Sequence, residues 1–244
     1  YLDSGGSLLL SGMNALDENG KAIFQEQGIE VSGPSPYTHT FLHAEPVIAN
    51  GIEEYGFVMY EPGFRMKPAQ GAESLIRVGE PYFERTYDRF SGHSYTPEAN
   101  LSEYSAAVLN GKVLTISVPI FGAYGEHASP VYRKMIGNCI DRLIEQPIIR
   151  DNGPTALETT VVTNEHSVIV HLMSYVAERR TSMLDVVEEA FPIIDMDIAI
   201  LCDVPPKRVF LAPDETELDY TYRDGYVHAT CSVTDGHRMI VIER

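Results

Sequence analysis

The sequence has 244 residues, of which 44% are hydrophobic, which is enough chain for one large domain or two modest domains with buried cores. Its formal net charge is −17, from 35 acidic and 18 basic residues. Because this excess of negative charge repels phosphate groups, it argues against nucleic acid and anionic membrane surfaces as partners.

The first residues are typical of the interior of a longer polypeptide. The chain begins with Tyr1 in place of methionine and reaches Gly5-Gly6 and the apolar run Leu8–Leu10 almost at once. No stretch approaches the roughly 18 apolar residues of a membrane span, and no signal-peptide pattern is present. We therefore expect a fragment, whose compartment the sequence does not determine, although the cytoplasm is slightly favoured.

The first 100 residues predict short elements. Ser7–Ser11 is a continuous apolar run of the kind found in buried parallel strands. Asp17–Gln27 is expected to form a short helix, and the glycine, serine and proline residues of Gly28–Pro36 predict a loop. Turn signals then separate three extended segments, namely Thr38–His43, Phe57–Tyr60 and Leu75–Val78. Gly92–Asn100 is polar and is expected to be a loop.

The clearest pattern lies between Gly111 and Leu143. Asn110-Gly111 is a strong hairpin signal between Ser105–Leu109 and the β-branched run Lys112–Val118. Ser129-Pro130 is a helix start with a capping hydroxyl and a proline at the first helical position. The helix that follows carries an apolar stripe made of Val131, Met135, Ile136, Cys139, Ile140 and Leu143.

The second half of the chain predicts mainly strands, with one short helix at Met183–Glu189. The strands are Leu157–Thr163, Ser167–Met173, Ile193–Leu201, Arg208–Ala212, Leu218–Tyr222, Tyr226–Val233 and Met239–Glu243. Short strands joined by turns at this spacing predict an antiparallel β-sandwich. We therefore expect an α/β domain over residues 1–149 and a β-sandwich domain over residues 150–244.

The best candidate for a functional site is Pro119–Ser129, which is expected to be a loop that joins the carboxyl end of a strand to a helix. It contains Phe121, Tyr124, Glu126 and His127. Glu126 and His127 are one potential acid–base pair. The preferred interpretation is structural, with these residues anchoring the helix or facing a neighbouring subunit or its cleft. Because the segment lacks both GxGxxG and GK[ST], it predicts no nucleotide cofactor.

Other groups of residues are weaker candidates for a functional site. His39 and His43 lie in an extended segment, where four residues span about 13 Å, too far for one metal ion. Cys139 lies inside the helix stripe and not on the sharp turn that a nucleophile requires. With Cys202 and Cys231 it is expected to be a small buried thiol, although a Cys202–Cys231 bridge stays open. We expect no metal and no cofactor. Tyr220, Tyr222 and Tyr226 are the candidates for stacking on a sugar.

Three stretches carry a resemblance to a known family. GGSLLLSG near the start and NGKVLTISVPIFGAYGEHASPVYRKMIGNCIDRL resemble the trimerisation domain of bacterial β-galactosidases and of related α-L-fucosidase-like enzymes. PTALETTVV, SVIVHLMSY and the closing segment from PKRVFLAP to MIVIE resemble the C-terminal β-sandwich of the same proteins.

This resemblance implies a partial Rossmann- or flavodoxin-like (amidotransferase-like) domain followed by a β-sandwich. It also implies a homo-oligomer, possibly a trimer, whose catalytic (β/α)8 barrel lies elsewhere in the same polypeptide. No catalytic residue carries over to this chain, because the resemblance assigns the catalytic carboxylates to the barrel. The expected function is therefore subunit assembly and support of the barrel. The alternative is a carbohydrate-binding module that holds glycan on the sandwich tyrosines.

Overall fold

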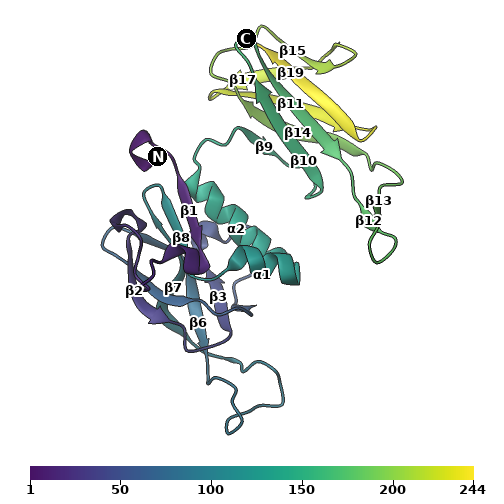
Figure 1. Ribbon diagram of the computed structural model, residues 1–244. Coiled ribbons are helices and arrows are strands. Elements are labelled where there is room, and N and C mark those ends of the chain that lie inside the picture. The colour runs from purple at the N-terminus through teal and green to yellow at the C-terminus, as the bar shows by residue number, and fades with distance from the viewer. The chain divides into compact units, whose positions relative to one another are not determined.

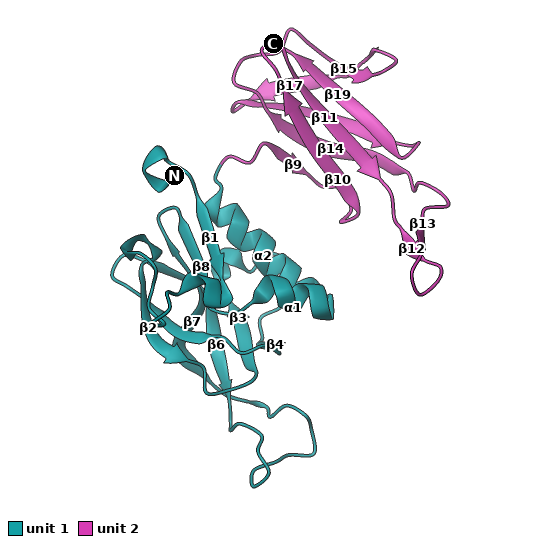
Figure 2. Cartoon of the chain, viewed as in Figure 1, with its two compact units in different colours: residues 1–145 teal, residues 146–244 magenta.

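The computed structural model describes residues 1–244, which form two compact units, residues 1–145 and residues 146–244 (Figures 1 and 2). Each unit encloses an apolar core of its own. No helix is both long enough and apolar enough to cross a membrane. All three cysteines are free and buried, so the Cys202–Cys231 bridge is absent and the interpretation as buried thiols is confirmed.

Unit 1 is built on an eight-stranded sheet with the order β1-β8-β7-β6-β3-β4, to which β5 and β2 are added through β7. Its strands are β1 (Leu8–Ser11), β2 (Ile29–Pro34), β3 (Thr40–Ala44), β4 (Phe57–Met59), β5 (Phe64–Pro68), β6 (Glu73–Pro81), β7 (Glu98–Asn110) and β8 (Val113–Ile116). Short 3₁₀ turns connect them at Leu2–Ser4, Gly12–Ala15, Gln25–Gln27 and Pro46–Ile48.

The pairing of β1 and β8 is parallel, as the apolar run at Leu8–Leu10 indicates, whereas every other strand pair in unit 1 is antiparallel. A Rossmann-like sheet is therefore not confirmed. The hairpin prediction is confirmed, because Asn110 pairs with Val113 and Gly111 adopts the left-handed φ of 55° that the two-residue turn requires.

Several predictions for the first 100 residues were wrong. Asp17–Gln27 contains only the 3₁₀ turn at its end, because the Asp17 carboxylate accepts the backbone N–H groups of Asn19 and Lys21 and closes a turn in place of a helix. Gly28–Pro36 contains strand β2, whose register is shifted by a bulge between Val31 and Gly33. The expected loop at Gly92–Asn100 ends early, because β7 begins at Glu98.

Two helices, α1 (Ile120–His127) and α2 (Pro130–Leu143), pack on one face of this sheet (Figure 1). The predicted span of α2 is confirmed, although the Ser129 hydroxyl makes no capping bond. Four residues of its apolar stripe, Met135, Ile136, Cys139 and Leu143, are buried in the main core with β-strand residues such as Leu42 and Leu114, and the other two are partly buried against it. Full burial of each large side chain contributes about 1.5–3 kcal/mol, which is why the amphipathic pattern determines how α2 packs.

Unit 2 is a β-sandwich of two antiparallel sheets, with the orders β10-β11-β19-β15-β16 and β17-β18-β14-β9. A separate pair, β12–β13, extends from it. The strands are β9 (Ile149–Asp151), β10 (Leu157–Thr163), β11 (Ser167–Ser174), β12 (Glu178–Arg179), β13 (Asp185–Val186), β14 (Ile193–Leu201), β15 (Arg208–Ala212), β16 (Thr216–Glu217), β17 (Tyr220–Arg223), β18 (Tyr226–Val233) and β19 (His237–Glu243).

The core of unit 2 lies between its two sheets. Val170 and Ile240 from one sheet and Ile200 and Val227 from the other are completely buried. In β11 the buried and half-buried residues alternate strictly, so that every second side chain faces away from the core. The predicted sandwich is therefore confirmed. The predicted helix at Met183–Glu189 was wrong, since these residues are irregular apart from β13, which pairs with β12.

Candidate functional site

Unit 1 contains a recess of about 580 Å³ where the end of β4, the end of α1 and the start of α2 meet. It is lined by Gly56, Phe57, Val58, Tyr60, Tyr95, His127, Ser129 and Tyr132. Its lining combines aromatic rings with an imidazole and hydroxyl groups. Such a mixture of apolar walls and a few polar groups is typical of a binding site.

His127, which lines the recess, is hydrogen-bonded to the carboxylate of Glu61. The His127 Nε2 atom lies 2.6 Å from Oε1 of Glu61, and both side chains are about 30% exposed. The second carboxylate oxygen of Glu61 is buried and accepts no hydrogen bond. A carboxylate paired with an imidazole at this distance can hold and transfer a proton, which gives the recess the elements of an acid–base pair.

Aromatic rings surround this pair. The Tyr60 ring centroid lies 4.8 Å from that of His127 and 5.1 Å from that of Tyr95, and Tyr95 in turn contacts His39 at 5.1 Å. Behind them, the Tyr132 hydroxyl donates to the Val58 carbonyl. Burial raises the pKa of Tyr132, so its hydroxyl stays a neutral donor that fixes α2 to β4.

The four residues predicted from the Pro119–Ser129 segment divide into two groups. The expectation of a loop was wrong, because most of the segment forms α1. His127 lines the recess, whereas Glu126 is exposed and Glu61 takes the place of its partner. Adjacent residues on a helix point about 100° apart, so Glu126 and His127 do not converge. Phe121 and Tyr124 are 45% and 36% exposed, and their spacing of three residues places them on one side of α1.

The sequence did not single out Tyr60 and Tyr95, which line the recess, or Glu61, which is the partner of His127. Glu61 precedes Pro62-Gly63, which marks a turn but gives no sign of a partner 66 residues further on. The pairing arises only because β4 and α1 are brought together by the sheet.

The histidines His39 and His43 do not share a site. His39 Nε2 lies 3.0 Å from the Thr96 carbonyl oxygen, and His43 Nε2 lies 2.6 Å from the Glu98 carboxylate. Each ring therefore holds a different residue near the start of β7.

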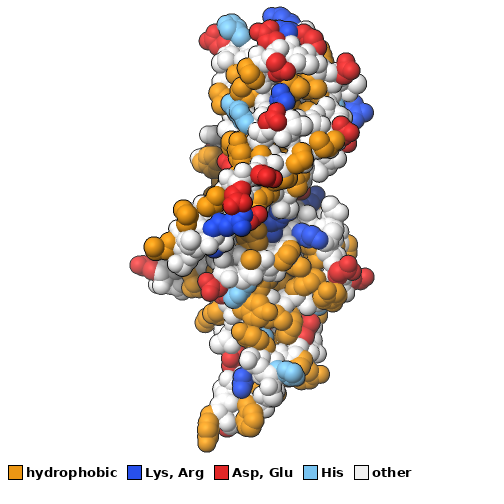
Figure 3. Space-filling model, turned by 90° about the vertical axis from the view of Figure 1, so that its right-hand side faces the viewer, with side chains coloured by type: hydrophobic (Ala, Val, Ile, Leu, Met, Phe, Trp, Pro, Cys, Tyr) orange, Lys and Arg blue, Asp and Glu red, His pale blue; other side chains and the backbone are white.

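Unit 1 also exposes many large aromatic side chains. Figure 3 shows hydrophobic side chains, in orange, gathered on the visible face of this unit in the lower half of the picture. The exposed aromatic residues of unit 1 are Tyr1, Tyr55, Tyr60, Tyr82, Tyr87, Phe90, Tyr95, Phe121 and Tyr124. Exposed apolar patches of this kind are typical of interaction surfaces.

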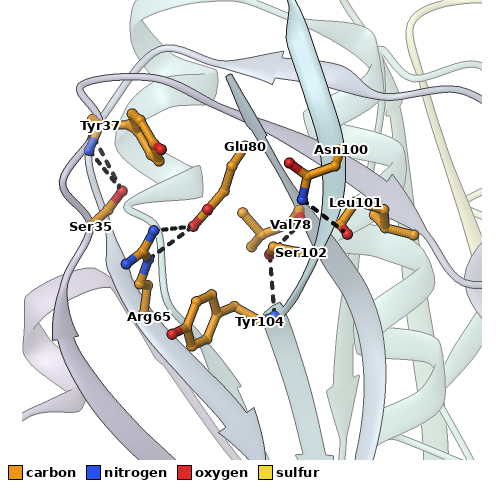
Figure 4. A network of polar contacts seen from close by, with 9 residues as sticks. All are labelled: Ser35, Tyr37, Arg65, Val78, Glu80, Asn100, Leu101, Ser102 and Tyr104. Atoms are coloured by element: carbon orange, nitrogen blue, oxygen red, sulfur yellow. Dashed lines mark hydrogen bonds and ion pairs between the residues drawn. The ribbon is translucent and has the colours of Figure 1, made fainter. Parts of the chain in front are cut away.

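A second polar cluster in unit 1 connects β5, β6 and β7 (Figure 4). The Arg65 guanidinium donates to one Glu80 oxygen at 2.9 and 2.6 Å and lies 4.9 Å from the Tyr104 ring centroid. The Ser102 hydroxyl donates to the Val78 carbonyl and accepts the Tyr104 N–H. Because its members bind one another, this cluster holds the strands together.

Unit 2 carries a concavity of about 670 Å³ over the sheet β17-β18-β14-β9. One row of paired residues, Thr221, His228, Ala199 and Arg150, crosses all four strands within it. A neighbouring position holds Asp197, which accepts a hydrogen bond from the Thr230 hydroxyl at 2.9 Å.

The three tyrosines predicted to stack on sugar are poorly placed for this role. Tyr226 is only 8% exposed, and its hydroxyl donates to the Pro147 carbonyl. Tyr222 packs against the core and donates to the Cys202 carbonyl. Tyr220 is 37% exposed and borders the concavity, opposite Ala229. Because it lies two residues from Tyr222 on β17, it is on the same side of the sheet as Tyr222, which is the side that faces the core.

Neither models of protein families nor curated protein sequences match this chain. Among solved structures, it is similar to α-L-fucosidase isoenzyme 2 from Paenibacillus thiaminolyticus, with a TM-score of 0.89 and 26% identity over 99% of this chain. The matched region makes up 37% of the fucosidase chain. A β-galactosidase from Bacillus circulans sp. alkalophilus gives a TM-score of 0.49 with 12% identity, covering 98% of this chain and 29% of the enzyme.

A β-galactosidase from Rahnella sp. R3 gives a TM-score of 0.47 with 11% identity, covering 97% of this chain and 28% of the enzyme. Of these three structures, the fucosidase superimposes closely on this chain, whereas the two β-galactosidases give TM-scores below 0.5. The resemblance that the sequence motifs indicate is thus confirmed, and this chain is similar along nearly its whole length to one region of a bacterial glycoside hydrolase.

Proposed function

We propose that this chain is the non-catalytic C-terminal region of a glycoside hydrolase of the α-L-fucosidase or β-galactosidase type. In this role it joins subunits and supports a catalytic barrel that lies elsewhere in the same polypeptide. One observation carries the proposal: 99% of the chain superimposes on a region that makes up only 37% of an α-L-fucosidase. The rest of such an enzyme is large enough to hold a separate catalytic domain.

The surface of unit 1 supports the role in assembly. Its exposed aromatic side chains include Phe121 and Tyr124 on α1 and Tyr60 and Tyr95 beside the recess. A second copy of the chain or the barrel of the same polypeptide is the expected partner, and a trimer is the first arrangement to test. The parallel pair β1–β8, followed by α1 and α2, supports the finer assignment of unit 1 as a partial flavodoxin-like domain.

An assay of the isolated chain tests the non-catalytic role. We expect purified residues 1–244 to hydrolyse neither aryl α-L-fucosides nor aryl β-galactosides. The control is the Glu61→Gln variant, which removes the carboxylate charge from the pair with His127. Hydrolysis by the unaltered chain that disappears in this variant would show that the recess is itself an active site, and the proposal would be wrong.

Light scattering of the parent polypeptide tests the role in assembly. Replacing both Phe121 and Tyr124 with serine is expected to shift the oligomer toward monomers. The matched control is Tyr175→Ser, which removes an aromatic ring of similar exposure from unit 2. An oligomer that is unaffected by the α1 substitutions would exclude this face of α1 from the interface.

The alternative function, a carbohydrate-binding module, is favoured by the polar concavity of unit 2 but not by its tyrosines. Any glycan bound there would contact mainly charged and hydroxyl groups, because Tyr220 is the one aromatic residue that borders the concavity. Titration with galactose- and fucose-containing oligosaccharides, followed by NMR of the Thr230 and His228 amides, distinguishes the two functions. Shifts that saturate and vanish in Asp197→Ala would support the alternative, and unchanged spectra would reject it.

A further inference from the structure

Two histidines and two methionines meet on the outer face of the five-stranded sheet of unit 2. His171 and Met173 lie on β11, and His237 and Met239 lie on the adjacent β19. The register places Met173 directly opposite His237 and His171 directly opposite Met239. Their neighbours in the strands, such as the completely buried Leu172, face the core, so these four side chains face away from it.

The two imidazoles already converge. Nδ1 of His171 lies 3.1 Å from Nε2 of His237, and the ring planes differ by only 7°. Two imidazole nitrogens bound at 2.0–2.1 Å to one tetrahedral ion lie about 3.3 Å apart, and two at adjacent corners of a square-planar ion lie about 2.9 Å apart. The observed separation falls between these values. The two nitrogens are thus already at the separation that one ion requires, and binding requires the rings to turn about their side-chain bonds so that both lone pairs face it.

The methionines determine which ion fits. Directly opposed residues on antiparallel strands have Cβ atoms about 4.5–5.5 Å apart, and methionine has three rotatable bonds, so both thioethers can reach an ion held by the imidazoles. No third histidine, cysteine or carboxylate joins the pair to complete a site for zinc or a harder ion. Thioether sulfur is a soft ligand that favours Cu(I), and imidazole binds both oxidation states of copper.

We propose that His171, His237, Met173 and Met239 form a copper-binding site, with Cu(I) as the preferred state. This site is independent of the proposed role in assembly and lies in the other unit. The net charge of −17 raises the local concentration of cations around the chain. An ion held from both strands connects β11 to β19, and because it binds the folded form it stabilises unit 2.

The test is a titration of the 244-residue chain with Cu(I) under anaerobic conditions, in competition with a chromogenic Cu(I) chelator. We expect one tightly bound ion per chain and a higher unfolding temperature of unit 2 when copper is bound. His237→Ala is expected to lower the affinity about tenfold or more. Since His237 is exposed, this variant is expected to fold, and circular dichroism of the metal-free chain verifies that it does.

Two further variants make the assignment specific. Replacing Met173 and Met239 with leucine keeps their volume and is expected to weaken Cu(I) binding while leaving Cu(II) binding within about threefold. His166→Ala, which removes an exposed histidine from a turn in the same unit, is the matched control and should change neither the Cu(I) affinity nor the Cu(II) affinity. Equal Cu(I) affinity of the unaltered and His237→Ala chains would overturn the proposal. So would a loss of Cu(I) affinity in His166→Ala as large as that in His237→Ala.

Discussion

The imidazole of His127, at the end of α1, and the carboxylate of Glu61, in the turn after β4, lie 2.6 Å apart although 66 residues separate them in the chain. The pair connects a helix end to the edge of the sheet beside an aromatic recess. Its sequence neighbour Glu126 is exposed and takes no part in it.

We expect this pair to contribute little to stability. Both side chains are about 30% exposed, so water and salt screen their attraction. Glu61→Gln should therefore change the free energy of unfolding of unit 1 by about 0–1 kcal/mol. Urea unfolding, monitored through the hydrogen exchange of the α2 amides, measures this change, and Glu126→Gln is the control. A loss several times larger would mean that the pair holds the turn in place.

The Arg65–Glu80 pair is expected to matter more. The side chains of Arg65 and Glu80 are 26% and 14% exposed, and two N–H groups of the arginine reach one carboxylate oxygen (Figure 4). Glu80→Ala should destabilise unit 1 by about 1.5–3 kcal/mol, because it leaves a partly buried guanidinium without its partner.

The matched control for this prediction is the pair Arg142–Glu73, whose side chains are 41% and 44% exposed. Glu73→Ala should cost about 1 kcal/mol or less. Both variants are measured by urea unfolding under the same conditions. Equal effects of the two substitutions would contradict the assignment of Arg65–Glu80 as the stabilising pair.

The buried Tyr132 hydroxyl provides a third prediction. It donates to the Val58 carbonyl, and Tyr132→Phe leaves that carbonyl oxygen without its donor. We expect a loss of about 1–2 kcal/mol in the stability of unit 1. The control is Tyr124→Phe on α1, because Tyr124 is exposed and its hydroxyl remains in contact with water. If Tyr132→Phe is as stable as the unaltered chain, water replaces the lost donor.

The sequence predicts local structure well where one pattern dominates. The stripe from Val131 to Leu143 predicts α2, and the Asn110-Gly111 pair predicts the β7–β8 hairpin. Local patterns gave wrong predictions at Asp17–Gln27 and Pro119–Ser129. In the first segment, a turn closed by the Asp17 side chain replaces the expected helix. In the second, the two glycines within α1 are poor helix formers, so the pattern did not indicate a helix.

The recess itself could not be predicted from the sequence. His127 was a candidate because it lies next to Glu126, yet its observed partner Glu61 belongs to a segment with no functional pattern. Likewise His171 and His237 are far apart in the chain and meet only through the register of β11 and β19. Pairings across a sheet depend on long-range register, which local periodicity does not encode.

The buried thiol of Cys139 makes the stability of unit 1 sensitive to alkaline pH. Burial in the core raises the pKa of Cys139 from 9.0 to about 12, because the thiolate would lose its hydration there. When the chain unfolds, the thiol regains its ordinary pKa. Between pH 9 and 12 the unfolded chain therefore releases a proton that the folded chain retains, and the stability of unit 1 falls as the pH rises.

The sign and size of this effect are testable with one substitution. At pH 10.5 the unfolded thiol lies about 1.5 pH units above its pKa, so the lost stability is about 2 kcal/mol. Cys139→Ala removes the titrating group and keeps a good helix former in α2. We therefore expect the stability difference between the unaltered chain and this variant to shrink by about 2 kcal/mol between pH 8 and pH 10.5, as measured by hydrogen exchange of unit 1. A difference that stays constant over this range would show that the Cys139 thiol titrates equally in the folded and unfolded chains.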